Sequence, residues 1–314
     1  MTIQTAGDHS ASLATDRGGG NISVTNSTLN TSGSGSPLIY STGAIEVSDV
    51  TGTAEGSQIV GMEGLNHIKI YDSELSSTIT DKTASDPVAN GVIIYQSTSG
   101  DADTSTGECA QFQVVDSTLS SKIESGAMFY VTNTSADILL SGTTLDFDSS
   151  KAKLLQIEGN DANNWGRAGS NGADVTFTGL GETLTGDISV DSISSLDLYF
   201  LDGTTYTGQI QSVANAGGQN DSAANAGDQN DSVTNANATV TVNLDQDSTW
   251  IVTGDTTVFT LNAEDGAQLV DADGKTVSIV ADGSTVVKGD SDLTVTVTGS
   301  YSQTVTTSEA NEIS

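Results

Sequence analysis

A short pattern of apolar and polar positions recurs along the first half of this chain. Two apolar residues separated by one polar residue are followed by Asn, Asp or Gly, then by a small polar pair, and then by Leu. Copies of the pattern occupy residues 22–29, 68–75, 112–119 and 138–145, with a fainter copy at 45–52. Ile22, Ile45 and Ile68 follow one another at intervals of 23 residues. One structural unit of about 22 residues is therefore repeated, with occasional insertions.

Each unit contains two predicted strands. In the first strand, alternation places Ile68 and Ile70 on the buried side and Lys69 outside, and the same holds for Ile22 and Val24. Leu75 points inward again after the intervening polar residues, so the chain has turned a corner and forms a coil. A second apolar strand follows in each unit, at residues 37–40, 59–62, 92–95, 128–131 and 154–157.

This arrangement predicts an all-β fold, a right-handed parallel β-helix in which strands of successive coils pair about 4.8 Å apart. Helical periodicity is almost absent, and the repeat lacks the spacing of a propeller blade or a Greek-key sandwich. A solenoid also explains how a chain with 35% hydrophobic and only 5% aromatic residues builds a core, because its interior is thin.

The pattern divides the chain into five segments. Residues 1–20 are expected to form a lead-in or cap, and residues 21–212 the coils, with insertions at 96–110 and 158–171. Residues 213–238 contain a near-duplicated, polar, low-complexity sequence and are expected to form a mobile loop. Residues 239–306 resume the strand pattern as further coils or a C-terminal cap, and residues 307–314 are expected to be a frayed tail.

The charge balance narrows the range of partners. With 41 acidic and 9 basic residues the net charge is −32, so no basic cluster is available for nucleic acid or an anionic membrane. The acids also keep a long β surface soluble and discourage association between sheets. No apolar run approaches the roughly 20 residues of a membrane helix, so direct membrane insertion is not expected. The lone Cys109 forms no internal disulfide and gives no metal-ligand spacing.

One column of the repeat carries Asn26, Asp49, Asp72 and Asp116 at the same corner of successive coils. Stacked carboxylates are suited to acid/base chemistry or to calcium. Asn and Asp also serve turns, because their side chains bond the turn backbone and tolerate its dihedral angles. Gly142 occupies the same column and has no side chain, which favours the turn role.

The two insertions follow second strands of nearby coils and are therefore expected to project from the same side. An aromatic ring among Asn and Asp residues suits stacking on a sugar ring. The alternative is that Trp165 pins its own loop and Arg167 pairs with a nearby acid. The candidate ligand-binding residues are Asp101, Asp103, Glu108, Asp161, Asn163, Asn164, Trp165 and Arg167.

No cofactor is expected, although calcium stays open as a weak alternative. Asp101-Ala102-Asp103 and Asp271-Ala272-Asp273-Gly274 resemble the start of a calcium loop, but neither continues with the full ligand spacing. A lyase would need a base beside such acids, and His9 and His67 are the only histidines. A hydrolase using a carboxylate pair remains the alternative, because many coils offer carboxylates.

The C-terminal third carries a family resemblance. Residues 247–254, Asp-Ser-Thr-Trp-Ile-Val-Thr-Gly, and the following Val258-Phe259-Thr260-Leu261-Asn262 resemble the rungs of bacterial autotransporter passenger domains, which are pertactin-like β-helices. The resemblance by motif covers about 60 residues. Other groups of secreted β-helix proteins look similar at this level.

The resemblance implies a secreted or cell-surface adhesin without catalytic residues. Its expected partners are a host glycan, a surface or matrix protein, or a sister cell, with self-association as a further partner class. The second hypothesis is a polysaccharide-acting lyase or hydrolase. Ice binding would require regular Thr-x-Thr ranks, and residues 294–298 are an isolated run.

Overall fold

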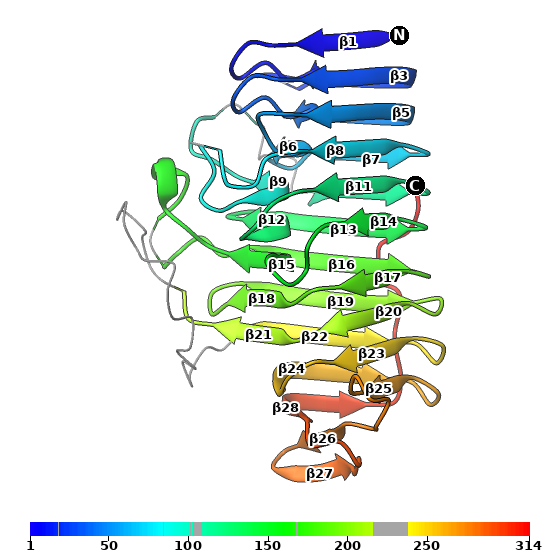
Figure 1. Ribbon diagram of the computed structural model, residues 1–314. Helices are drawn as coiled ribbons and strands as arrows, with labels where there is room; N and C mark the ends of the chain where they lie inside the picture. Colours follow the sequence, from blue (N-terminus) through cyan, green and yellow to red (C-terminus); the bar gives the residue numbers. More distant parts are fainter. Residues whose placement is uncertain (18, 84, 101, 103–108, 168, 216–237) are drawn as a thin grey trace.

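The computed structural model describes residues 1–314 except 18, 84, 101, 103–108, 168 and 216–237. The chain winds downward through successive coils from the N-terminus, and strands of neighbouring coils lie side by side along the whole stack (Figure 1). Nearly all strand pairs are parallel, so the predicted parallel β-helix is confirmed.

Three sheets form the walls of this stack. Sheet A has 16 strands: β1 (Thr2–Thr5), β3 (Asn21–Thr31), β5 (Ala44–Ala54), β7 (His67–Tyr71), β8 (Glu74–Ser77), β10 (Ala110–Val115), β11 (Thr118–Ser121), β13 (Ser135–Ser141), β14 (Thr144–Asp146), β16 (Asp174–Leu180), β19 (Ser195–Leu201), β22 (Thr239–Leu244), β24 (Thr256–Ala263), β26 (Ser278–Ala281), β27 (Ser284–Val287) and β28 (Thr294–Ser302). Sheet B has eight: β2 (Leu13–Ala14), β4 (Ile39–Ser41), β6 (Val60–Glu63), β9 (Asn90–Tyr95), β12 (Ala127–Thr132), β15 (Lys153–Glu158), β18 (Ile188–Asp191) and β21 (Ile210–Val213). Sheet C has four: β17 (Thr183–Thr185), β20 (Thr205–Gly208), β23 (Thr249–Val252) and β25 (Gln268–Val270).

The columns expected from the repeat are the columns of the structure. Ile22, Ile45, Ile68, Phe112 and Ile138 pair in register across β3, β5, β7, β10 and β13. The second strands pair in sheet B in the same way. The 44-residue step from Ile68 to Phe112 is thus a single coil enlarged by insertions, because β7 and β10 are direct neighbours.

The corner residues have the backbone conformation that the turn interpretation requires. Their φ angles are 48° at Asn26, 54° at Asp49, 47° at Asp72 and 48° at Asp116, and 62° at Gly142. Asn, Asp and Gly tolerate this left-handed region best. The side chains of the four Asx residues are exposed, so the column is a series of turns on the surface, as the sequence favoured.

The core is a narrow apolar column inside the three sheets. Phe112, Phe129 and Phe177 stack edge to face through its centre, with ring centroids 6.1 Å and 6.2 Å apart. The expectation that Ile22 and Val24 are buried holds only in part, since both stay half exposed. The reason is that β1 pairs with β3 only from Thr28 onward.

The C-terminal end departs from the simple repeat. β27 pairs antiparallel with β26, and β28 lies between β24 and β26. The chain then runs back along the outer face of sheet A (Figure 1), so that the C-terminal Ser314 contacts β7 and β10. The Asn311 side chain donates to the carbonyls of Ile138 and Thr176, at 2.9 Å and 3.0 Å.

The prediction of a frayed C-terminal tail is therefore wrong. Ser314 accepts from the Lys69 ammonium at 3.1 Å and the Tyr71 hydroxyl at 2.8 Å, and its N–H donates to Gln113 at 3.1 Å. Gln113 lies between the core residues Phe112 and Val114 on β10 and so points outward, yet it is only 5% exposed because this segment lies over it. Burial and the nearby carboxylates of Asp197 and Glu309 raise the pKa of Tyr199 further along the same face.

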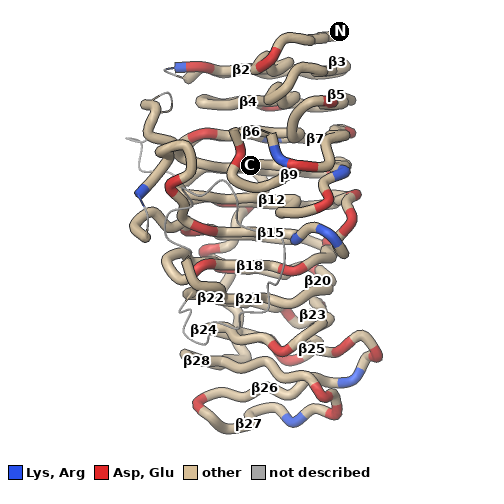
Figure 2. The backbone as a smooth tube through the Cα atoms, turned by 60° about the vertical axis from the view of Figure 1, so that its left-hand side comes forward, with Lys and Arg blue, Asp and Glu red and all other residues tan. Residues whose placement is uncertain are grey.

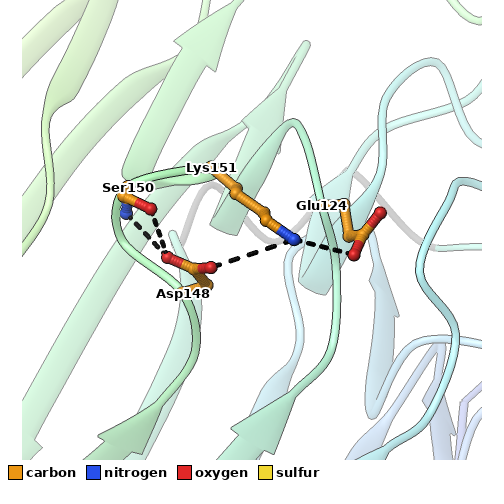
Figure 3. Close-up of polar contacts among 4 residues, drawn as sticks. All are labelled: Glu124, Asp148, Ser150 and Lys151. Atoms are coloured by element: carbon orange, nitrogen blue, oxygen red, sulfur yellow. Dashed lines mark hydrogen bonds and ion pairs between the residues drawn. The ribbon is translucent and has the colours of Figure 1, made fainter.

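Acidic residues occupy turns and strand edges along the whole stack, with few basic residues among them (Figure 2). One exposed cluster joins neighbouring coils: Lys151 lies 2.8 Å from Glu124 and 4.0 Å from Asp148 (Figure 3). Ser150 in turn donates to Asp148. No helix in the described part of the chain is long and apolar enough to span a membrane.

Candidate functional site

The two insertions meet over the outer face of sheet B. One follows β9 and the other follows β15, and these strands flank β12. The Thr98 hydroxyl donates to the backbone carbonyl of Asn164 at 2.5 Å. The rings of Tyr95 and Trp165 stack, with centroids 4.4 Å apart and planes 21° from parallel. The described parts of the two insertions thus lie on the same side, as expected from their positions after second strands.

Two adjoining cavities open beside this stack, with volumes of ≈ 290 Å³ and ≈ 440 Å³. Volumes of this size suit a small ligand or one unit of a polymer. The residues that line both are His9, Gly35, Tyr40, Ser85, Tyr95 and Trp165. We call these two adjoining spaces the sheet B cavity. It is assembled from the first coils, the face of sheet B and the second insertion.

Strand alternation explains why two tyrosines face this cavity. In β4, Ile39 and Ser41 are buried, so Tyr40 between them points outward. Its register partner in β6 is Gly61. A Cβ atom at Gly61 would lie 3.3 Å from the Tyr40 ring, so the missing side chain leaves the ring lying over the strand backbone and keeps the floor of the cavity open.

A buried carboxylate forms the second feature of the cavity wall. Glu63, only 2% exposed, lies at the end of β6. Its Oε2 accepts from the Tyr40 hydroxyl at 2.8 Å and the Tyr95 hydroxyl at 3.2 Å. Its Oε1 accepts from the Ser97 hydroxyl and from the Ser99 hydroxyl, the latter at 3.2 Å.

These contacts keep Tyr95 protonated. Burial, followed by the charges of Tyr40 and Glu63, raises the pKa of the Tyr95 hydroxyl well above its usual value. The tyrosine therefore stays a donor to Glu63. Within the described residues no lysine, arginine or histidine forms an ion pair with this carboxyl group, and the donors to it are the four hydroxyl groups.

Asp86 contributes a second carboxyl group to the wall. It is 6% exposed and accepts from the Asn90 amide at 3.1 Å. Burial raises its pKa to about 6, although hydrogen bonds from Asn90 and Thr83 and the charge of Lys82 act in the opposite direction. Asn90 Oδ1 is buried and has no hydrogen-bond partner within the described part of the chain. Of these two residues, Asp86 lines the cavity and Asn90 lies behind it.

Only some of the predicted ligand-binding residues line the sheet B cavity. Trp165 and Asn163 line the sheet B cavity, and the Asn163 amide donates to the Ser85 carbonyl at 2.6 Å. Asp161, Asn164 and Arg167 belong to the same insertion but are not among the described residues that line the cavity. Asp101, Asp103 and Glu108 lie outside the described residues.

Sequence reasoning missed the other half of the site: His9, Tyr40, Glu63, Asp86 and Tyr95. One signal was present. Tyr40 and Tyr95 occupy outward positions of second strands, where an aromatic ring has no core to fill. An outward aromatic residue on a β-helix face needs either a covering loop or a ligand.

A pair of carboxylates lies lower on the same sheet. Glu158 and Asp191 follow the register partners Ile157 and Val190 on neighbouring strands. Burial, with a contribution from Asp191, raises the pKa of Glu158. Each Glu158 oxygen accepts one hydrogen bond, from Tyr130 at 2.8 Å and from Gln156 at 3.1 Å. Asp191 accepts from the Gly159 N–H at 2.9 Å and also from Asn215.

The calcium-like sequences give no metal site among the described residues. Asp271 closes a turn: its Oδ1 accepts the N–H groups of Asp273 and Lys275, both at 2.9 Å. Ser291 donates to the other oxygen at 2.7 Å. In the parts of the chain that are described, no three His, Cys, Asp or Glu side chains gather closely enough to hold a metal ion.

No protein-family model, curated protein or solved structure matches this chain.

Proposed function

We propose that this chain is the ligand-binding β-helix of a secreted or cell-surface attachment protein, and that it holds a sugar unit of a glycan in the sheet B cavity. The observation that carries the proposal is the Tyr95–Trp165 stack, which lines a cavity together with Tyr40. Flat aromatic faces beside polar groups suit a sugar ring, which presents C–H groups on its faces and hydroxyls at its rim.

The position of the Trp165 ring favours ligand binding. Trp165 is half-buried, so part of its ring is pinned by Tyr95 while another part lines the cavity. A ring fixed in this way is ordered before the ligand arrives, which reduces the entropy lost on binding. The surrounding serines and Asn163 supply hydrogen-bonding groups at the rim.

The attachment role is supported by the resemblance to passenger domains, which concerns the body of the β-helix. Trp250, the centre of the resembling segment, is fully buried and donates to the Gly208 carbonyl at 3.0 Å. Its ring packs against Tyr206 inside the coil. The likeness is thus one of core packing, and the choice of ligand rests on the sheet B cavity alone.

The test is a glycan array followed by calorimetry on the best ligand. Trp165→Ala should weaken binding about tenfold or more, because aromatic anchors carry a large share of binding energy. Phe259→Ala is the matched control: this aromatic ring is 46% exposed on β24 and does not line the sheet B cavity. Absence of any glycan ligand, or unchanged affinity in Trp165→Ala, would refute the proposal.

The second candidate is a polysaccharide-acting enzyme, favoured by the Glu158–Asp191 pair. Glycoside hydrolases usually use two carboxyl groups that lie in different environments. Incubation with a broad panel of polysaccharides and assay for new reducing ends or unsaturated products tests it. Activity that Glu158→Gln abolishes would support this candidate, and no product from any polymer would reject it.

A further inference from the structure

We infer that the sugar unit held in the sheet B cavity carries a free amino group, as in a glucosamine-type unit, with its ring against the aromatic side chains and its ammonium attracted by the carboxyl groups of the wall, Glu63 and Asp86. This inference rests on the proposed function and narrows its ligand. It is carried by the joint presence of carboxylates and aromatic rings in one cavity.

The wall of the sheet B cavity carries two carboxyl groups. Glu63 lines one part of the cavity and Asp86 lines the other, and both are nearly fully buried. A buried carboxylate is costly unless it is paired with positive charge or well hydrogen bonded. Four hydroxyl groups already satisfy the two oxygens of Glu63, but no described basic side chain forms an ion pair with it. A ligand ammonium in the cavity would be attracted by the charge of the wall and needs no free hydrogen-bonding position on Glu63.

The basic groups near the cavity do not fill this role. Lys82 acts on Asp86 through its charge, but its ammonium donates to the Pro87 carbonyl at 3.2 Å and is not among the lining residues. His9 lines the cavity and is exposed. His9 forms no ion pair with Glu63 or Asp86 within the described residues.

The aromatic rings of the cavity also favour a cation. A cation is attracted to the faces of Trp and Tyr, most strongly where water is partly excluded. Tyr40, Tyr95 and Trp165 all line both parts of the cavity. The rings and the carboxylates therefore favour the same kind of ligand group, an organic cation next to a flat apolar face.

Acidic and neutral sugars fit the charge of this cavity less well. Uronate, sulfate and sialate units bring a negative charge to a wall that carries two carboxyl groups, in a protein with a net charge of −32. Like charges at short range in a partly dry site are strongly unfavourable. Neutral sugars meet no repulsion, yet they give Glu63 no counter-charge.

The experiment compares three oligomers that share one backbone and differ only at the second carbon: cello-oligomers with hydroxyl, chitosan oligomers with amine and chitin oligomers with N-acetyl. Calorimetry at pH 6.5 should give the tightest binding for the amine, by about tenfold over the other two. Glu63→Gln should remove this preference while its thermal unfolding stays cooperative.

Asp86→Asn serves as a second variant if Glu63→Gln fails to fold. Glu74→Gln, an exposed position on β8 in another wall, is the matched control for loss of one charge. Equal or tighter binding of chitin or cello-oligomers would overturn the inference while leaving the proposed function in place. Binding of none of these sugars, nor of any array glycan, would overturn both. An amine preference unchanged in both acidic-site variants would overturn the assignment to Glu63 and Asp86.

Discussion

The indole ring of Trp165 lies almost flat against the phenol ring of Tyr95, with centroids 4.4 Å apart. One residue belongs to an insertion after β15 and the other ends β9, two strands away in sheet B. This contact fixes the second insertion over the face of the β-helix. It also makes the cavity wall depend on a long-range contact.

Trp165→Ala should therefore loosen its own loop without unfolding the coils. Loss of the stack costs about 1 kcal/mol locally, and amide exchange at Asn164 and Trp165, whose N–H groups bond Asp161 and Ala162, should accelerate. Trp165→Phe, which can still stack, is the control. Exchange rates equal to those of the unaltered protein would show that other contacts hold the loop.

Glu182 gives the fold a pH dependence. It follows Gly181, which has a φ of 65° like the corner residues of other coils. The corner residues Asp72, Asp116 and Gly142 are followed by Ser or Thr instead. The Glu182 Oε1 accepts the Thr143 N–H at 2.8 Å. Burial, with a contribution from Asp116, raises the pKa of Glu182 to about 7 from 4.5. The carboxyl therefore favours folding most below pH 4.5, and this contribution is lost as the pH rises through 7.

Glu182→Gln should remove this loss of folding stability at high pH. At pH 8 the variant is expected to be more stable than the parent by about 2 kcal/mol, after allowance for solvent screening at a corner, and the difference should shrink towards pH 4.5. Urea unfolding at several pH values measures it. Glu74→Gln, exposed on β8, controls for net charge, and a pH-independent difference for Glu182→Gln would contradict the assignment.

Phe129 is the centre of the aromatic column between Phe112 and Phe177. Phe129→Ala leaves a cavity in a fully buried site and should lower the free energy of unfolding by about 3–5 kcal/mol. Phe259→Ala, on a ring that is 46% exposed, should change it little. Chemical denaturation measures the free energy of unfolding of both variants. Similar losses of this free energy in the two variants would show that the aromatic column is not the core of the stack.

Asn311 anchors the C-terminal segment to sheet A through two side-chain hydrogen bonds and one from its N–H to Thr178. Asn311→Ala should cost about 1–2 kcal/mol and release the segment from the face it covers. Limited proteolysis after residue 302 should then become faster. Glu312→Ala, with an exposed side chain, is the control, and equal cleavage rates in both variants would refute the anchoring role.

The sequence by itself determined the coil. Alternating apolar residues define the strands, and Asn, Asp or Gly at Asn26, Asp49, Asp72, Asp116 and Gly142 permits the left-handed corners. Each unit meets these local requirements separately, so they recur in the sequence and can be recognised there. The register of successive coils follows because each unit must keep its apolar side chains on the inside.

Only the tertiary structure decided the site. Tyr40, Glu63, Tyr95 and Trp165 come from different coils and share no local motif. They meet because parallel stacking brings strands of successive coils to one face, and because the insertion after β15 places Trp165 over that face. The docking of Asn311 on sheet A and the burial of Glu182 have the same origin. Contacts between distant segments depend on how the coils stack, which a local pattern does not specify.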